Sequence, residues 1–252
     1  MEELYNKALL NSGPKILKIL KALKMFLTTE LICVHSQLKE NGQLNLKQNK
    51  ISKKFVYLVS PNKIKDDSFY IELDQVLSSK KVNFFQLRLK NETNKNKITI
   101  GKKIKKICKK YEVKFLINDD PILAKKLNAD GCHLGQKDMN ILKARKILNN
   151  KIIGITCHNS INLAKKAIKN GADYLAFGAF YFTQTKKTKH KASLKILKLA
   201  KKITNIPIVA IGGIGLVNYK KLLLNKANFL AISGYIWDNK KYKPLEAIKK
   251  LK

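Results

Sequence analysis

The chain has 252 residues and a formal net charge of +35, because 52 lysines and arginines are balanced by only 17 acidic residues. A hydrophobic fraction of 45% indicates a globular protein with one sizeable core and excludes wholesale disorder. No apolar run approaches the roughly 20 residues of a membrane span, and the acidic start MEELYNKALL lacks the basic segment of a secretion signal, so we expect a cytoplasmic protein.

The first 54 residues differ in pattern from the rest. Between Pro14 and Leu27 the leucines and isoleucines recur at helical spacing and the lysines fall elsewhere, which predicts a basic amphipathic helix. Such a helix can lie on a membrane surface, but more often it packs on its own domain. The polar stretch from Lys39 to Lys54 is typical of a linker. We therefore expect an N-terminal helical extension and linker over residues 1–54, followed by one domain over residues 55–252.

From Phe55 onwards, short apolar runs alternate with lysine-rich helical patterns at intervals of roughly 25 residues. Apolar strands that are each followed by a helix predict a closed parallel (β/α)8 barrel, the TIM barrel, with an open doubly wound sheet as the alternative. The number of runs and the absence of GxGxxG after the first one favour the barrel. The expected strands are residues 55–60, 84–90, 114–119, 131–135, 152–157, 174–180, 207–213 and 229–234.

Polar residues gather where these runs end. In a (β/α)8 barrel the carboxyl ends of the strands form the functional face, so these side chains should converge on one mouth. They include cations, carboxylates, hydroxyls and glycines: Gln86, Arg88, Lys90, Asn118, Asp119, His133, Gln136, Asp138, Thr156, His158, Thr183, Thr185, Lys186, Gly212, Gly213, Ser233 and Gly234.

The residue types at the mouth indicate phosphate and metal chemistry. Arg88 and Lys90 alternate with leucines and so share a face with Gln86, which suits a polyphosphate. Asp119 and Asp138 follow adjacent strands and could hold Mg²⁺, which also accepts water and phosphate oxygens as ligands. The glycines of IGGIG and of the last run offer backbone N–H groups to a further phosphate.

Each of these signals also has a structural interpretation. A lone acid at a strand end is more often a helix N-cap than a metal ligand, and Asp120 before Pro121 has that pattern. His133, in the middle of a run, is more often a hydrogen-bonded core residue than a catalyst. The four cysteines are widely spaced and contain no CxxC, so we expect free thiols. The joint occurrence of the polar residues at successive strand ends favours a functional site.

Six motifs, in order over roughly residues 55–251, resemble those of the thiamine phosphate synthase family. QLRLK is similar to the family's Gln-x-Arg-x-Lys, INDD to Ile-Asn-Asp, and GCHLGQKDM to its most specific stretch. IIGITCHN, GADYLAFGAFYFTQTKK and IPIVAIGGI are similar to the three later segments. The chain departs from the family at Thr156, which is usually serine, at Ala179 and Phe182, which are usually prolines, and at Ser233–Gly234, where one hydroxyl is lost.

The resemblance implies a magnesium-dependent transferase of thiamine biosynthesis. It would join 4-amino-2-methyl-5-hydroxymethylpyrimidine diphosphate to a thiazole phosphate, carboxylated or not, by dissociative, Mg²⁺-assisted loss of diphosphate. Such catalysis rests on positioning and electrostatics and needs no nucleophile such as Cys157. By position, the residues that hold the pyrimidine diphosphate would be Gln86, Arg88, Lys90, Asn118, Thr156 and Lys186. Of these, Arg88, Lys90, Lys186 and Thr156 would be catalytic. The thiazole phosphate would contact Thr183, Thr185, Gly213, Ser233 and Gly234, and Mg²⁺ would bind Asp119 and Asp138.

Two other functions compete with this one. A thiazole tautomerase has the same barrel and would use His158 for proton transfer, but it has no diphosphate for QLRLK, both acids and TQTK to bind. A non-catalytic nucleic-acid or membrane module would suit the net charge, but only Arg88 and Arg145 are arginines, and the lysines are spread along the chain. We therefore expect small-molecule substrates and no nucleic acid, and leave a homo-oligomer open.

Overall fold

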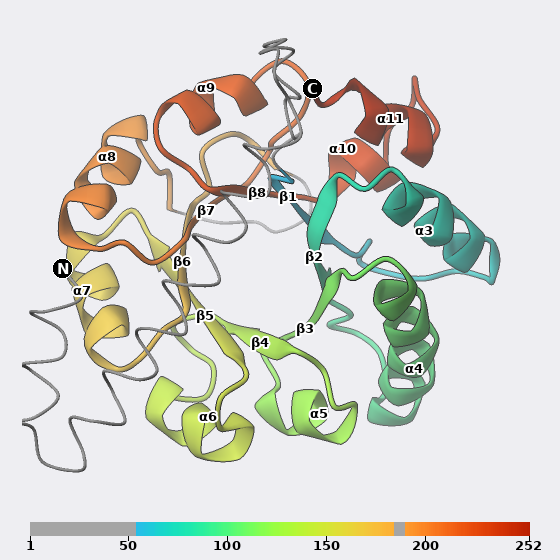
Figure 1. Ribbon diagram of the computed structural model, residues 1–252, viewed down its shortest axis with the longest axis horizontal. Coiled ribbons are helices and arrows are strands. Elements are labelled where there is room, and N and C mark those ends of the chain that lie inside the picture. Colours follow the sequence, from blue (N-terminus) through green and yellow to red (C-terminus); the bar gives the residue numbers. More distant parts are fainter. Residues whose placement is uncertain (1–53, 184–189) are drawn as a thin grey trace, which may run out of the picture. The chain divides into compact units, whose positions relative to one another are not determined.

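A computed structural model of the chain describes residues 54–183 and 190–252. Eight parallel strands close into a barrel in chain order, β1 to β8, and β8 pairs with β1 (Figure 1). The predicted (β/α)8 barrel is therefore confirmed. The strands are β1 (Val56–Val59), β2 (Val82–Leu87), β3 (Lys114–Asn118), β4 (Gly131–Leu134), β5 (Ile152–His158), β6 (Tyr174–Gly178), β7 (Ile208–Ile211) and β8 (Phe229–Ile232).

Helices surround the barrel, as Figure 1 shows. Several begin at a side chain that accepts a backbone N–H of the first turn: Thr93, Asp120, Asn140 and Ser160 cap α4 to α7. The predicted capping role of Asp120 is thus confirmed. The helices are α3 (Ser68–Ser78), α4 (Asn94–Lys110), α5 (Pro121–Lys126), α6 (Ile141–Leu148), α7 (Ile161–Lys169), α8 (Leu194–Ile203), α9 (Tyr219–Leu224), α10 (Gly234–Trp237) and α11 (Pro244–Lys250).

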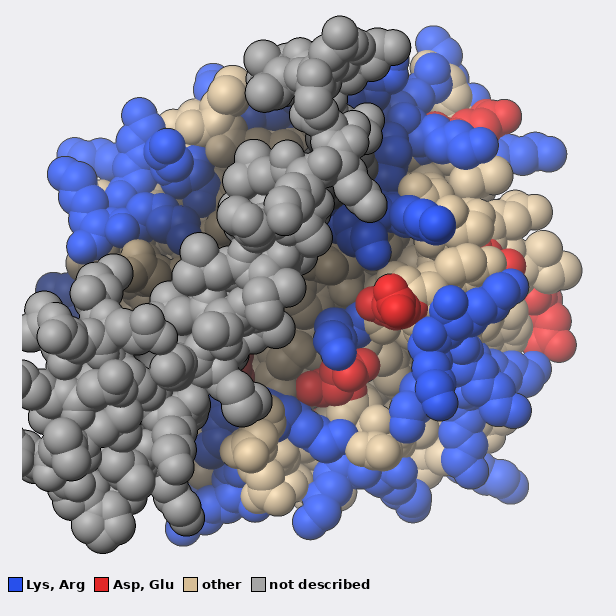
Figure 2. All heavy atoms as spheres, viewed as in Figure 1, with Lys and Arg blue, Asp and Glu red and all other residues tan. Residues whose placement is uncertain are grey.

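The predicted extension over residues 1–54 lies outside the described residues, apart from Lys54. Among the residues that are described, no helix is long and apolar enough to cross a membrane. Lysine and arginine side chains border the described surface on several sides in Figure 2 instead of gathering in one patch. This distribution agrees with a solvated basic surface.

Two apolar layers form the core. The larger lies between the barrel and the helices, and includes Leu58, Phe85 and Leu175. The smaller fills the barrel interior with residues such as Leu116 and Val209, together with two tyrosines, Tyr57 and Tyr174. The strands are buried on both faces, which explains why their sequences are continuously apolar instead of alternating.

Three helix-to-strand loops on the N-terminal face of the barrel share one short motif. Each has a residue at positive φ, then a buried alanine, then Asp or Asn directly before the strand, in the sequences NAD, GAD and KAN. The alanine N–H bonds back to the preceding helix in each loop. This ending stops the helix and aligns the next strand. The motifs span residues 128–130, 171–173 and 226–228.

The last residue of this motif connects neighbouring strands. Asp130 accepts the N–H of Phe115 at 2.8 Å, Asp173 that of Ile153 at 2.7 Å, and Asn228 that of Ile208 at 2.9 Å. In each pair the backbone N–H of the acceptor residue also bonds the carbonyl of the same partner, at 2.8 Å. An N–H group in the first two residues of β3, β5 and β7 is thereby satisfied at the edge of the barrel.

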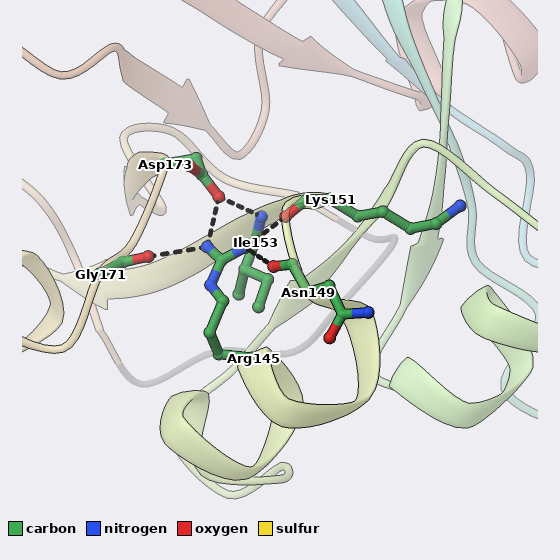
Figure 3. A network of polar contacts seen from close by, with 6 residues as sticks. All are labelled: Arg145, Asn149, Lys151, Ile153, Gly171 and Asp173. Atoms are coloured by element: carbon green, nitrogen blue, oxygen red, sulfur yellow. Dashed lines mark hydrogen bonds and ion pairs between the residues drawn. The ribbon is translucent and has the colours of Figure 1, made fainter.

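Arg145 reinforces the second of these loops (Figure 3). From α6 its guanidinium donates to the carbonyls of Asn149, Lys151 and Gly171 at 2.6–2.8 Å, and it forms an ion pair of 2.7 Å with Asp173. One planar cation with several donors can bridge two loops in this way, whereas an ammonium cannot match the same geometry. Arg145 therefore has a structural role, far along the chain from the motif that contains Arg88.

Candidate active site

Gln86, Arg88 and Lys90 form a series of increasing exposure at the end of β2. Gln86 is buried, Arg88 is half-buried just beyond the strand, and Lys90 is exposed. Arg88 is held from both sides, because its N–H donates to Ser60 Oγ at 2.9 Å and its Nη1 to Asn62 Oδ1 at 2.7 Å. The expectation that these residues share one face agrees with this arrangement. The expected strand was too long, since β2 ends at Leu87.

Asp119 and Asp138 come together at the ends of β3 and β4. Their carboxyl groups lie in contact with each other, and Lys90 Nζ lies 3.3 Å from Asp119 Oδ2. Asp138 Oδ2 also accepts the N–H of Gly135 at 2.6 Å. Burial and this contact raise the pKa of Asp138. Burial opposes ionisation of Asp119 as well, but Asp138 and Lys90 lower the pKa of Asp119.

The backbone at Asp119 explains why the second acid of INDD, and not the first, is the helix cap. Asp119 has φ of +65°, a conformation rare for residues other than glycine, and its N–H donates to His133 O at 2.8 Å. Asp120 caps α5 through a bond of 2.9 Å to Leu123 N. The chain therefore turns sharply between them, and the two neighbouring acids serve different purposes. Non-glycine residues in such conformations concentrate at functional sites.

The donor set of this acid pair fits Mg²⁺. Within the described residues, no group of three or more His, Cys, Asp or Glu side chains could hold a metal ion. Mg²⁺, however, usually takes one or two carboxylates and completes its shell with water and substrate phosphate. Two adjoining carboxyl groups, whose pKa values move in opposite directions, form a site that a divalent cation would relieve of its like-charge contact.

Thr156 lies across the mouth on β5. Its Oγ1 is 2.8 Å from His133 Nε2, and Gln136 Nε2 donates to the Thr156 carbonyl at 2.5 Å. His133 is buried and its Nδ1 is 2.8 Å from Tyr174 OH. The interpretation of His133 as a hydrogen-bonded core residue is thus confirmed, although one of its partners is an expected substrate-binding residue.

The glycines after β7 pack against the segment that leads to Thr183. A Cβ on Gly213, at φ of +63°, would lie 2.2 Å from the carbonyl oxygen of Phe182. Tyr181 N also donates to Gly212 O at 3.1 Å. The structure therefore brings two predicted thiazole-phosphate residues, Thr183 and Gly213, into one region. Thr185 and Lys186 lie outside the described residues.

Ser233 and Gly234 stand at the start of α10, after β8. The Ser233 hydroxyl donates to Ser60 O at 3.1 Å, so it connects β8 to the loop that follows β1. A phosphate at this position would therefore meet backbone N–H groups more readily than the Ser233 hydroxyl. The role of this pair stays a prediction.

Cys108, Cys132 and Cys157 are buried free thiols, as expected. Burial raises the pKa of Cys157 to about 12, so the thiol stays protonated and is a poor nucleophile. His158, the residue that a tautomerase would use, has φ of +52° and its ring stacks on His190 at 3.9 Å. These observations favour catalysis by charge and position over covalent catalysis.

Some residues of the site had no signal in the sequence. Asn62 holds Arg88 from a loop that resembles any polar turn, and Tyr57 and Tyr174 lie within apolar runs that read as core. A cavity of about 240 Å³ beside the acids is lined by Lys90, Asn118, Asp119 and Asp120, with Lys97 and the side chains of Leu87, Leu89, Ile117 and Leu123. Contacts between residues far apart in the sequence create all of these features.

Comparison with known proteins identifies the family. The family model described as thiamine monophosphate synthase matches residues 56–236. The thiamine-phosphate synthase of Pelagibacter ubique is 79% identical over 207 residues, which cover 82% of this chain and all of that protein. That of Marinobacter nauticus is 38% identical over 181 residues, 71% of this chain and 81% of the relative.

Solved structures agree. Thiamine phosphate pyrophosphorylase from Pyrococcus furiosus has a TM-score of 0.70 at 27% identity and covers 79% of this chain and 94% of its own. A 3-hexulose-6-phosphate synthase, with a TM-score of 0.56 at 17% identity, shows the shared fold alone. The matched model spans most of the barrel and includes Gln86, Arg88, Asp119, Asp138 and Thr156. This chain therefore belongs to the thiamine monophosphate synthase family.

Proposed function

We propose that this chain, a transferase of thiamine biosynthesis by its family, joins an aminopyrimidine diphosphate to a thiazole phosphate and releases pyrophosphate. The observation that carries the proposal is the adjoining pair Asp119 and Asp138 beside Lys90 and Arg88, at one end of the barrel. Like-charged carboxyls beside two cations suit a polyphosphate that arrives with a divalent cation.

Arg88 and Lys90 would bind the diphosphate. Arg88 is oriented by Ser60 and Asn62, so its guanidinium keeps its position before substrate binds. Lys90 is exposed and pairs with Asp119 on the neighbouring strand end, an exposed ion pair that it can exchange for a phosphate oxygen at a small cost in free energy. Lys186 would add a third cation. Together they would stabilise the negative charge that grows on the diphosphate as it leaves.

Asp119 and Asp138 would hold Mg²⁺, whose charge would further stabilise the leaving diphosphate when it is bound. Asp119 has a lowered pKa and so supplies an ionised carboxylate readily. Burial and the contact with Asp119 oppose the ionisation of Asp138, which a bound cation would favour. Gln86, Asn118 and Thr156 would orient the aminopyrimidine. The developing cation at its methylene carbon would then face the thiazole, held by Thr183, Thr185, Gly213 and the Ser233–Gly234 pair.

Water exclusion is part of the same proposal. A cation formed by loss of diphosphate reacts with any nucleophile in reach, so the thiazole nitrogen must lie closer to it than water does. The polar groups beneath the mouth, Gln86 and His133, already bond to protein partners. Capture by the thiazole therefore depends on positioning and not on a protein nucleophile.

Incubation of the purified chain with both phosphorylated heterocycles tests the proposal. We expect thiamine phosphate and pyrophosphate in equal amounts with Mg²⁺ present, and loss of both products in excess EDTA. Running the carboxylated and uncarboxylated thiazole phosphates in parallel assigns the second substrate. Product formation that is unchanged by EDTA would contradict the metal role. Absence of product with either thiazole would contradict the reaction itself.

A further inference from the structure

A continuous series of hydrogen bonds crosses the barrel interior beneath the mouth. Gln86 Nε2 donates to Tyr57 OH, Tyr57 OH meets Tyr174 OH, and Tyr174 OH meets His133 Nδ1, each at 2.8 Å. His133 Nε2 then meets Thr156 Oγ1, also at 2.8 Å. This interior hydrogen-bond chain joins two expected substrate residues, Gln86 on β2 and Thr156 on β5.

The rings of the interior hydrogen-bond chain are held in place by packing. Tyr174 stacks on His133 at 5.6 Å and meets Tyr57 edge-on at 5.8 Å. A Cβ on Gly154 would lie 1.8 Å from Tyr174 Cζ, so only glycine at this point of β5 leaves room for the ring. The barrel is thus built around these side chains, which fixes their bonding partners.

Each hydroxyl has one hydrogen to donate, and this fixes which atom is the donor in every bond of the interior hydrogen-bond chain. An amide Nε2 can only donate, so Tyr57 oxygen accepts from Gln86. Burial keeps both phenols protonated, because it raises the pKa of Tyr57 and of Tyr174. The single Tyr57 hydrogen therefore goes to Tyr174, the other polar neighbour that the described residues offer it. Tyr174 must then donate to His133 Nδ1, which can accept only if it carries no hydrogen.

The opposite direction fails on the same count. If His133 carried a hydrogen on Nδ1, Tyr174 would have to donate to Tyr57. The Tyr57 hydrogen would then face the N–H group of Gln86 inside the barrel. A buried donor without an acceptor is costly and rare. This argument excludes the Nδ1–H tautomer of the neutral ring.

We infer that the interior hydrogen-bond chain fixes His133 as the Nε2–H tautomer and makes the Thr156 hydroxyl a donor toward the mouth. With Thr156 Oγ1 accepting from His133, its own hydrogen is directed to an acceptor atom of the substrate. Given the proposed function, that acceptor belongs to the pyrimidine diphosphate. Tyr57, Tyr174 and His133 are then positioning residues that act through Thr156.

Nitrogen NMR of the substrate-free protein tests the direction without any turnover. With ¹⁵N-labelled histidine, and the His133 signals assigned by their loss in H133N, we expect a protonated Nε2 and an unprotonated Nδ1. Gln86→Glu replaces the terminal donor by an acceptor and should reverse the tautomer to Nδ1–H, while Tyr57→Phe, which interrupts the series, should give a mixture. A wild-type Nδ1–H form, or an unchanged tautomer in Q86E, would overturn the inference.

Kinetics test the action through Thr156. We expect Thr156→Val to lower kcat/KM on the order of 10²-fold, the effect of losing one aligned donor, and Thr156→Ser to recover most of it. Tyr174→Phe should lower kcat/KM on the order of 10-fold in the wild-type background. It should have no effect in the T156V background, because Tyr174 acts only through the Thr156 hydroxyl. Additive losses in the double variant would overturn the positioning role. Failure of the positioning role would leave the proposed reaction intact, because the assay of the wild-type protein tests that reaction separately.

Discussion

The two ends of this barrel use charged residues in opposite ways. On the N-terminal face, Asp130 and Asp173 each accept a backbone N–H near the start of a neighbouring strand, and Arg145 bonds three carbonyls and a carboxylate. At the mouth, Asp119 and Asp138 adjoin each other and Lys90 is exposed. At the N-terminal end these charged groups bond to backbone and to opposite charges. At the mouth, two carboxyl groups lie in contact, and a lysine beside them is exposed to solvent.

The contrast explains how a chain with few acids distributes them. Asp130 and Asp173 each occupy the last position of the repeated loop motif, so their environment is set by backbone geometry. The mouth loops share no such motif, and there the contact with Asp119 opposes ionisation of Asp138. Residues that destabilise the free protein but would bind a charged ligand are typical of functional sites. Position in the barrel therefore separates structural acids from functional ones.

The largest expected difference is between Asp119→Ala and Asp130→Ala. D119A should lower kcat/KM by at least on the order of 10²-fold, and it should change the free energy of unfolding by less than about 1 kcal/mol, since the exposed ion pair with Lys90 contributes little. D130A should leave kcat/KM close to wild type and lower the free energy of unfolding by about 1–3 kcal/mol, because Phe115 N–H loses its acceptor. Urea denaturation and steady-state kinetics measure both. Similar turnover in D119A and wild type would contradict the metal site.

The two arginines offer a second comparison through the same substitution. Arg88→Lys should lower kcat/KM about 10- to 100-fold, because an ammonium loses the forked geometry for a diphosphate. Arg145→Lys should spare turnover and lower the free energy of unfolding by about 2 kcal/mol, since one ammonium cannot reach all of its carbonyl partners. If R88K chiefly reduced stability, Arg88 would belong with the structural residues.

Exchange of acid and amide within the repeated motif should have a smaller effect. Asn228 occupies the same place as Asp173 and shows that an amide oxygen can accept the strand N–H. Asp173→Asn should therefore cost only the charge of its pair with Arg145, about 1 kcal/mol in the free energy of unfolding. Asn228→Asp should change it by less than about 0.5 kcal/mol. A loss in D173N as large as in D173A would show that the charge, and not the acceptor, matters.

The smallest effect is on the pH dependence of stability in EDTA. Because burial and Asp119 raise the pKa of Asp138 above 3.8, the folded state binds more protons than the unfolded state just above that value. The free energy of unfolding should therefore fall as the pH rises through this window, and D138N should remove the fall. Asp119, whose pKa is lowered, contributes stability above 3.8 that is lost on further acidification. Denaturation between about pH 3 and 7 measures both trends.

The barrel could be predicted because its strands are buried on both faces and read as continuous apolar runs. The acids at the mouth could be predicted too, since Asp119 and Asp138 follow such runs directly. Tyr57 and Tyr174 could not be assigned a polar role, because their hydroxyls meet across the barrel from strands 117 residues apart in sequence. The ends of the strands could not be predicted as well. The expected second strand ran to Lys90, whereas β2 ends at Leu87, because apolar and polar residues continue to alternate in the loop after it.

The repeated loop motif also implies the order in which the barrel opens. It couples β3 to β4, β5 to β6 and β7 to β8, so we expect amide deuterium uptake to occur in pairs of strands. The loop before β2 differs: Lys81 Nζ instead donates to the carbonyls of Lys249 and Leu251, near the last residue of the chain. The start of β2 is thus connected to the end of α11 and not to a neighbouring strand, so we expect it to exchange earlier than the paired strands.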